Sequence, residues 1–238
     1  IDIRQESRVI GKAFDAVVAA NPGLFLTNLA ELSQVEQLTF LLNIEGRIDT
    51  SVYKDPLTKD TLDSFGVIKE IQQMNGELGA HRYIISNCRG PVDMGKVIAL
   101  ARLCSWGNAL LTLDIVPLFE TVEDLKYGGR SLATIYHNET YKQHLIDRKK
   151  RQTVMLGFSD GTKDGGYLTA NWGIFRAKED ITKISRENGA EVVFFDGRGG
   201  PPARGGGNSH LFYSALGKTI ESRQIQITVQ GQTISSHY

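Results

Sequence analysis

Residues 191–200 read Glu-Val-Val-Phe-Phe-Asp-Gly-Arg-Gly-Gly, and this stretch decides the fold class. Large apolar side chains occupy four successive positions, 192–195, with no polar residue between them. A strand that is covered on both faces has this pattern, whereas a strand with one face in water alternates apolar and polar residues. The stretch therefore predicts a parallel sheet with helices packed outside it.

Similar apolar and β-branched runs before and after this stretch predict further strands. The six expected strands are residues 1–4, 82–86, 110–119, 153–158, 191–195 and 224–229. Helical patterns lie between them, which is the alternation of an α/β fold. Six strands are too few to close an eight-stranded barrel, so the residues alone leave two architectures open: a doubly wound open sheet or part of a barrel.

Several segments between the strands carry signals for helix starts, ends and faces. We expect one helix face at Leu62, Phe65, Ile68 and Ile71, and a helix that begins at Pro91 and is closed by Gly107 in a left-handed conformation. We expect a capping box at Thr121 and Asp124. A further helix is expected between about 165 and 188; it ends at Gly189, and its apolar stripe is Leu168, Trp172, Phe175, Ile181 and Ile184.

The composition narrows the function classes. The 238 residues carry 27 basic and 27 acidic side chains, so the net charge offers no bulk attraction to nucleic acid or to an anionic membrane. No apolar run approaches the roughly 18 residues of a membrane span. Only Cys88 and Cys104 are cysteines, which fits a reducing, cytoplasmic compartment. We expect a single domain over 1–238 and, since the chain opens at Ile1 rather than Met, an internal fragment of a longer protein.

Charged side chains gather just after the predicted strands, where parallel α/β folds place their sites. They are Arg4, Glu120, Asp160, Lys163 and Arg198. Carboxylates together with arginines and a lysine suit a divalent cation and a phosphorylated substrate. Taken singly, Arg4, Glu120 and Lys163 also fit solvated surface charges, and Asp160 also fits a turn.

Residues 197–207, here called the glycine–arginine segment, hold six glycines, two arginines and two prolines. A flexible linker and an RNA-binding Arg-Gly-Gly element are the alternatives. The segment directly follows a buried-type strand, which argues against a linker, and it contains no aromatic platform for RNA bases. Because glycine lets backbone N–H groups approach a phosphate and arginine supplies forked donors, we interpret the segment as an anion-binding active-site loop.

Two long motifs resemble signatures of phosphoenolpyruvate carboxylase. They are residues 154–166, Val-Met-Leu-Gly-Phe-Ser-Asp-Gly-Thr-Lys-Asp-Gly-Gly, and the Phe-Asp-Gly-Arg-Gly-Gly and Arg-Gly-Gly-Gly runs of 195–207. Pro-Leu-Phe-Glu-Thr at 117–121, Asp-Ile-Arg-Gln-Glu-Ser at 2–7 and Val-Gln-Gly-Gln at 229–232 are similar to that family in the same order. The resemblance implies a parallel β/α barrel of the TIM type, incomplete in this chain, with about six of the eight strands and surrounding helices.

The resemblance also implies an activity. Family members are lyases that fix carbon dioxide: with Mg²⁺ or Mn²⁺ they convert phosphoenolpyruvate and bicarbonate to oxaloacetate and phosphate, through carboxyphosphate and the enolate of pyruvate, and supply the tricarboxylic acid cycle. They are cytoplasmic, allosteric homotetramers inhibited by dicarboxylates. The present chain by itself is expected to be inactive. The alternative is a non-catalytic structural or regulatory piece of the barrel.

The resemblance carries roles onto particular residues. It assigns metal binding to Glu120 and Asp160, substrate binding to Arg4, Arg198, Gly199 and Gly200, and catalysis to Arg198, Arg204 and Lys163, with the dicarboxylate inhibitor near Arg204. One departure stands out, because Asp196 occupies a position where the family commonly has histidine. An aspartate is no cation at neutral pH, so a bicarbonate-binding role of that histidine does not transfer. Residues 201–203, Pro-Pro-Ala, also differ from the family and restrict the backbone.

Overall fold

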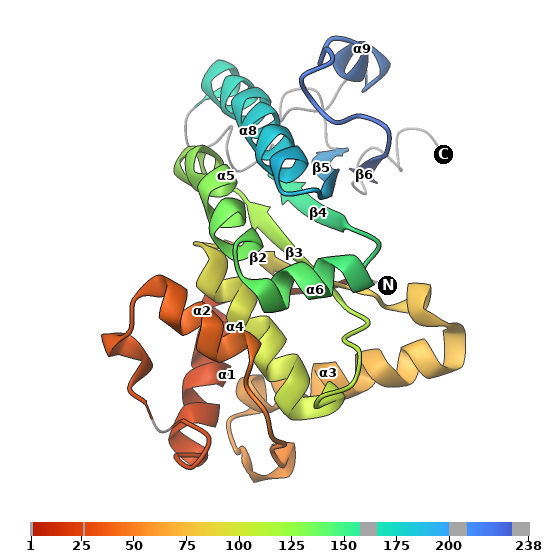
Figure 1. Ribbon diagram of the computed structural model, residues 1–238. Coiled ribbons are helices and arrows are strands. Elements are labelled where there is room, and N and C mark those ends of the chain that lie inside the picture. The colour runs from red at the N-terminus through yellow and green to blue at the C-terminus, as the bar shows by residue number, and fades with distance from the viewer. Residues whose placement is uncertain (1, 26, 158–165, 200–208, 230–238) are drawn as a thin grey trace. The chain divides into compact units, whose positions relative to one another are not determined.

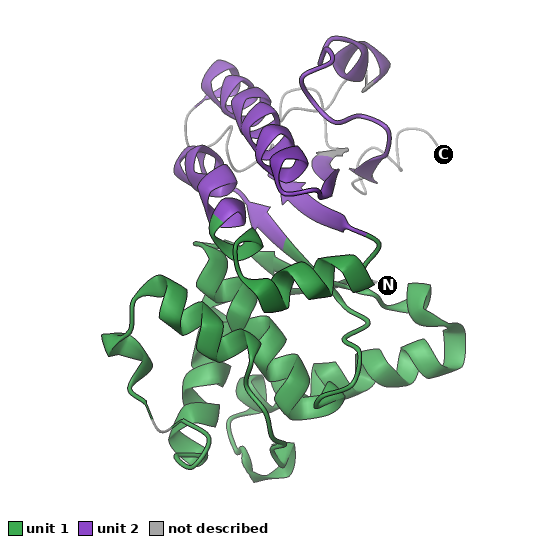
Figure 2. Ribbon diagram, viewed as in Figure 1, with its two compact units in different colours: residues 1–116, 134–149 green, residues 117–133, 150–238 purple. Residues whose placement is uncertain are grey.

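The structure is a computed structural model that describes residues 2–25, 27–157, 166–199 and 209–229. It divides into two compact units (Figure 2). Unit 1 comprises residues 1–116 and 134–149, and unit 2 comprises residues 117–133 and 150–238. The boundary therefore runs through the third strand and through the helix after it. The expectation of a single domain stays a prediction.

In the described residues, one or more helices lie between each pair of successive strands (Figure 1). The strands are β1 (Asp2–Glu6), β2 (Arg82–Ser86), β3 (Asp114–Phe119), β4 (Arg151–Leu156), β5 (Glu191–Gly199) and β6 (Ile225–Val229). The α-helices are α1 (Ser7–Ala20), α2 (Gln34–Leu42), α3 (Pro56–Asn75), α4 (Pro91–Ala101), α5 (Val122–Tyr136), α6 (Glu139–Asp147), α8 (Tyr167–Glu187) and α9 (Ser209–Ser214). The described residues also contain the 3₁₀ segments η1 (Leu29–Glu31), η2 (Thr50–Val52) and η3 (Glu77–Gly79) and the π-helical segment η4 (Arg102–Trp106).

The strand order is that of a β/α barrel. Each strand follows its predecessor in the chain, β1-β2-β3-β4-β5-β6, and the pairs β1–β2, β3–β4, β4–β5 and β5–β6 are parallel. A doubly wound sheet would reverse its strand order at a switch point. The expected fold class, a parallel β/α barrel with about six strands in this chain, is therefore confirmed.

In unit 1, the helices bury their apolar faces on one another. Helix α1 packs against α3 and α4, and α2 packs against α4. The expected face of α3 is confirmed at Leu62, Phe65 and Ile68, which are fully buried. Helix α4 begins at Pro91 as expected, and Gly107, with a φ of +54°, ends the π-helical segment that continues it.

In unit 2, strands β4, β5 and β6 pair over most of their lengths, and α8 packs against β5 (Figure 1). Helix α8 ends before Gly189, which has a φ of +69°, as expected. The expected apolar stripe of this helix is wrong over its first half, because Leu168 and Trp172 are 81% and 63% exposed. The expected position of Ile181 is confirmed, since this side chain is fully buried. The other buried residues of the helix are Ala170, Ile174, Ala177, Lys178, Thr182 and Ser185, which include a lysine and several small side chains.

Strand boundaries differ from expectation at two places that matter for the site. Strand β1 runs to Glu6, so Arg4 lies in the middle of the strand and not at its end. Strand β5 runs to Gly199, so the first residues of the glycine–arginine segment belong to the sheet. Parallel pairing with β4 and β6 extends β5 beyond the apolar run that predicted it. Residues 200–207 of that segment lie outside the described residues.

Candidate functional site at the carboxyl ends of the strands

The carboxyl ends of β3, β4 and β5 lie level with one another in unit 2. Phe119 of β3 pairs with Leu156 of β4, and Leu156 pairs with Asp196 of β5. The next residue on each strand is therefore Glu120, Gly157 and Gly197. This row is where the motifs of residues 117–121, 154–166 and 195–207 meet, far apart in sequence but adjacent in the sheet.

Glycine at position 157 allows a close approach between β4 and the end of β3. The Gly157 amide donates to the Phe119 carbonyl at 2.9 Å. A Cβ atom on residue 157 would lie 3.1 Å from the Glu120 Cα and 3.2 Å from its Cγ. Gly197 has a similar position, since its Cβ would lie 3.2 Å from the Leu156 carbonyl oxygen. The two glycines therefore set the spacing around Glu120.

Glu120 is held between a strand and a capped helix. It follows the buried end of β3 and is itself half-buried. The expected capping box is confirmed at the start of α5: the Thr121 amide donates to Asp124 Oδ2 at 3.2 Å, and the Asp124 amide donates to Thr121 Oγ1 at 3.1 Å. These reciprocal bonds fix the backbone immediately after Glu120.

The other residues expected in the site are placed only in part. Arg4 is an exposed residue of unit 1, paired in register with Ile84 on β2. Arg198 and Gly199 belong to the backbone of β5. Asp160, Lys163, Gly200 and Arg204 lie outside the described residues.

The end of β5 contains an irregularity at Arg198. Asp196 pairs with Ile227 and Gly199 with Val229, so β5 spends one more residue than β6 between these two pairs. Such a bulge twists a strand and redirects the side chains beside it. The sheet itself therefore imposes the local backbone geometry at the start of the glycine–arginine segment.

Asp196 occupies a position where the family commonly has histidine, and its side chain lies in a buried ion pair. Its carboxylate is fully buried, and Oδ2 accepts from Lys178 Nζ at 2.5 Å and from the Tyr213 hydroxyl at 2.7 Å. Lys178 belongs to α8 and is 1% exposed. Within the described residues, no donor reaches Asp196 Oδ1. The carboxylate therefore faces the helices of unit 2.

Sequence reasoning missed Lys178. A signal was present, because Lys178 follows Ile174 by four residues and precedes Ile181 by three, which places all three on one helix face. A lysine on an apolar face is ordinarily read as the edge of the buried stripe. Its burial depends on a carboxylate supplied by another element, which helix periodicity does not reveal.

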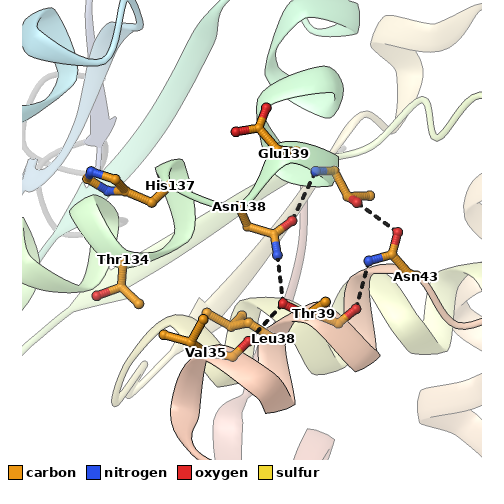
Figure 3. Close-up of a pocket in the computed structure, with 9 residues that line it drawn as sticks. Val35, Leu38, Thr39, Asn43, Thr134, His137, Asn138 and Glu139 are labelled. Atoms are coloured by element: carbon orange, nitrogen blue, oxygen red, sulfur yellow. Dashed lines mark hydrogen bonds between the residues drawn. The ribbon is translucent and has the colours of Figure 1, made fainter.

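A groove in unit 1 has the volume of a ligand site but not its chemistry (Figure 3). It measures about 490 Å³ and is lined by Val35, Leu38, Thr39, Asn43, Thr134, His137, Asn138, Glu139 and Thr140. Its polar side chains bond to one another: Asn138 Nδ2 donates to Thr39 Oγ1 at 3.3 Å, and Thr140 Oγ1 donates to Asn43 Oδ1 at 2.8 Å (Figure 3). We interpret the groove as the packing boundary between α2 and the turn that joins α5 to α6. None of the residues that line the groove was predicted for the functional site.

The described residues contain neither a side-chain cluster suited to a metal ion nor a helix suited to cross a membrane. Histidine, cysteine, aspartate and glutamate side chains in this part of the chain form no group of three or more that could hold a metal ion. Among the described helices, none combines the length and the apolar character needed to cross a membrane. Cys88 and Cys104 are both free thiols in the structure.

The sequential order of the parallel strands, with helices between them, defines the class of β/α-barrel proteins. The model of the phosphoenolpyruvate carboxylase family matches residues 1–238. The chain belongs to this family.

Individual relatives agree with the family assignment. Proteins named phosphoenolpyruvate carboxylase from Gloeobacter violaceus and Nitrosomonas eutropha are 34% and 32% identical to the chain over its full length. One from Xanthomonas oryzae is 36% identical over 73% of the chain. The chain spans about a quarter of the length of the first two, 26% in each case, and 20% of the third.

Proposed function

We propose that the whole protein converts phosphoenolpyruvate and bicarbonate to oxaloacetate and phosphate. The observation that carries this proposal is the row Glu120–Gly157–Gly197, which brings three family motifs to one edge of the sheet in unit 2. Family membership over the full chain supports the same reaction. Carboxylation in the cytoplasm to replenish the tricarboxylic acid cycle belongs to this proposal.

Glu120 and Asp160 would hold the divalent cation, Mg²⁺ or Mn²⁺. Carboxylate oxygens are hard ligands and fit such an ion, and Glu120 lies at a strand end fixed by the capping box of α5. When bound, the cation supplies Lewis-acid charge to oxygens of the substrate. Because Mg²⁺ demands near-ideal coordination geometry, the backbone that carries Glu120 needs to be rigid.

The arginines would bind the phosphoryl group. Arg198 and Arg204 supply forked donors, Gly199 and Gly200 expose backbone N–H groups, Arg4 contacts the substrate phosphate, and Lys163 lies toward bicarbonate. The planar guanidinium fits the oxygens of a phosphoryl group better than an ammonium does. A dicarboxylate inhibitor near Arg204 would use the same fork, and a homotetramer is the proposed assembly.

These groups suit a reaction in two stages. The phosphoryl group leaves the enol oxygen of phosphoenolpyruvate for an oxygen of bicarbonate, which gives carboxyphosphate and the enolate of pyruvate. Carboxyphosphate then releases carbon dioxide and phosphate, and the enolate carbon bonds to the carbon dioxide to give oxaloacetate. The arginines stabilise charge that moves between oxygens during the transfer, which is the main contribution a protein makes to phosphoryl transfer.

The test is oxaloacetate formation by the full-length protein with bicarbonate and Mg²⁺. We expect Arg198→Lys to lower kcat by about 100-fold, because it removes a preorganised forked donor while keeping the charge. The Mg²⁺ concentration for half-maximal rate should stay within about twofold, because that residue is no metal ligand. An unchanged kcat would contradict the role of Arg198, and a wild-type protein without turnover would favour the non-catalytic alternative.

A further inference from the structure

A buried charged cluster in unit 2 is not used by the proposed reaction. It consists of Lys178 on α8, Asp196 on β5 and Tyr213 on α9, and it is called the Lys178 cluster below. Both the lysine ammonium and the tyrosine hydroxyl donate to the same oxygen, Asp196 Oδ2, at 2.5 and 2.7 Å. Three separate elements therefore meet at one carboxylate oxygen.

The surroundings of the ammonium are aromatic. Lys178 Nζ lies 5.0 Å from the ring centroid of Phe194, 5.6 Å from that of Phe212 and 5.4 Å from that of Tyr213. A cation near the faces of such rings is stabilised when water is excluded. Burying an ion pair is nevertheless expensive, and removing one partner leaves the other charge uncompensated. The three elements are therefore held in one arrangement by the cluster.

The position of the cluster in the chain suggests what it holds. Asp196 comes directly before the glycine–arginine segment, and Phe212 and Tyr213 lie on the helix that follows it. The bond between Asp196 and Tyr213 thus joins the two flanks of the segment, 17 residues apart. Lys178 ties this junction to α8, a long helix that packs against β5.

We propose that Lys178, Asp196 and Tyr213 are positioning residues that fix both flanks of the glycine–arginine segment. By this means they set the backbone position of Arg198 at the end of β5. The kinetic part of this proposal rests on the proposed function. Aspartate at position 196 then has a specific use, since it is the acceptor that the buried lysine requires.

A test that needs no turnover is limited trypsin digestion of the full-length protein. Cleavage after Arg198 reports opening of the end of β5, because a protease samples the open population of a folded protein. We expect Lys178→Met to accelerate this cleavage at least about tenfold, as expected for loss of a buried charged bond. Cleavage after Lys142 on α6 in unit 1 should change less than about twofold, which separates segment opening from general unfolding.

Two further variants make the digestion specific. Lys183→Met is the matched control, because Lys183 lies on the same helix but is 75% exposed and only 4.0 Å from Glu187; its cleavage rates should remain those of the wild type. Tyr213→Phe removes one hydroxyl and keeps the ring, and we expect about a threefold acceleration. It also provides the answer if Lys178→Met does not fold.

A double-variant cycle tests whether the residues act together. Combining Lys178→Met with Asp196→Asn should accelerate cleavage by less than the product of the two single effects, since each change removes the same interaction. A full product of the effects would mean that they act independently and would overturn the cluster. Wild-type cleavage rates in both Lys178→Met and Tyr213→Phe would overturn it as well.

The kinetic arm distinguishes positioning from a structural role. In Lys178→Met, kcat per folded protein should fall about tenfold, while the Mg²⁺ dependence, which we assign to Glu120 after the end of β3, should stay within about twofold. An unchanged kcat together with faster cleavage would overturn the positioning role. If the wild type shows no carboxylation, the proposed function fails, and the digestion still decides whether the cluster fixes the segment.

Discussion

At the scale of single residues, the geometry of the candidate site depends on glycines, which have no side chain, as much as on charged side chains. Gly157 and Gly197 have no side chain, and this lets three strand ends lie close together beside Glu120. At neighbouring Asp196, a full carboxylate is buried because a lysine from α8 reaches it. Contacts of this kind predict effects of substitution that no surface charge would show.

Replacing Gly157 by alanine should disturb Glu120 directly. A Cβ atom 3.1 Å from the Glu120 Cα forces the backbone after β3 to move. We expect the Mg²⁺ concentration for half-maximal carboxylation by the full-length protein to rise about tenfold, since displacements of about 1 Å cost this much or more in an active site.

Gly173→Ala is the matched control for that change. Gly173 lies inside α8, and its Cβ would meet Leu125 Cδ1 at an ordinary 3.7 Å. Alanine there should stabilise the helix by about 0.5–1 kcal/mol and leave the Mg²⁺ dependence unaltered. Equal Mg²⁺ dependence in both alanine variants would show that the spacing at Gly157 is not required.

His144 makes the stability of unit 1 depend on pH. Burial, together with the positive charges of Arg148 and Arg102, lowers the pKa of this imidazole to about 4. In the unfolded chain the pKa of this histidine is about 6.5. As the pH falls from about 6.5 to 4, His144 is therefore protonated in the unfolded state but stays neutral in the folded state. We expect unfolding to become easier by roughly 3 kcal/mol across this window, with no effect above it.

Urea denaturation between pH 7 and pH 4 measures that dependence. His144→Gln removes the titrating group and should flatten the loss of stability over this range. His137→Gln is the control, because His137 lies nearby in the sequence, between α5 and α6, and its side chain is exposed. A slope that survives in His144→Gln would assign the acid sensitivity to other groups.

At the scale of elements, helix starts link the fold to the site. Two capping boxes have the same local chemistry but different neighbours: Ser33 with Glu36 begins α2, and Thr121 with Asp124 begins α5 directly after Glu120. A cap removed by alanine costs about 1 kcal/mol of stability in either place. The functional consequence should differ between the two.

Thr121→Ala should lower both stability and activity. Loss of the cap frees the first turn of α5 and the backbone of Glu120, so we expect kcat in the full-length protein to fall about fivefold to tenfold. Ser33→Ala should cost similar stability and leave kcat within about twofold. Equal kcat values in the two variants, measured well below the melting temperature, would show that the activity does not depend on the cap of α5.

At the scale of the whole molecule, large apolar side chains stay exposed. Examples are Met74 and Leu78 in unit 1 and Leu168 and Trp172 in unit 2, all more than 60% exposed. Large apolar side chains exposed to this extent are suited to burial against further protein. The family relatives, of which the chain spans about a quarter, have the additional length to do so.

The isolated chain should therefore self-associate and lack carboxylase activity. Exposed apolar faces and strands without a second neighbour favour contact between copies. Light scattering over a range of concentrations should show a mass that rises with concentration, and oxaloacetate should not form. A constant monomer mass would contradict the first expectation, and turnover by the isolated chain the second.

The residues of the chain predict the α/β class and the position of most elements, and the family resemblance predicts the barrel, which the observed strand order confirms. Uninterrupted apolar runs such as 192–195 mark strands covered on both faces, and their number and alternation with helices need no tertiary information. The capping box at Thr121 and the glycine that ends α8 follow from local chemistry in the same way. The motif at 117–121 also predicted that Glu120 lies directly after a strand, at the edge where parallel sheets collect such residues.

Only the tertiary structure decided how far β5 extends and what Lys178 does. Strand β5 continues beyond Asp196, where its pairing with β4 ends, to Gly199 because β6 pairs with it there, and this partner lies elsewhere in the chain. Lys178 is buried because Asp196, 18 residues away, and Tyr213 meet it when α8 and α9 pack in unit 2. A charge can be buried only where its partner is also brought, so its place depends on several elements at once, which no local pattern records.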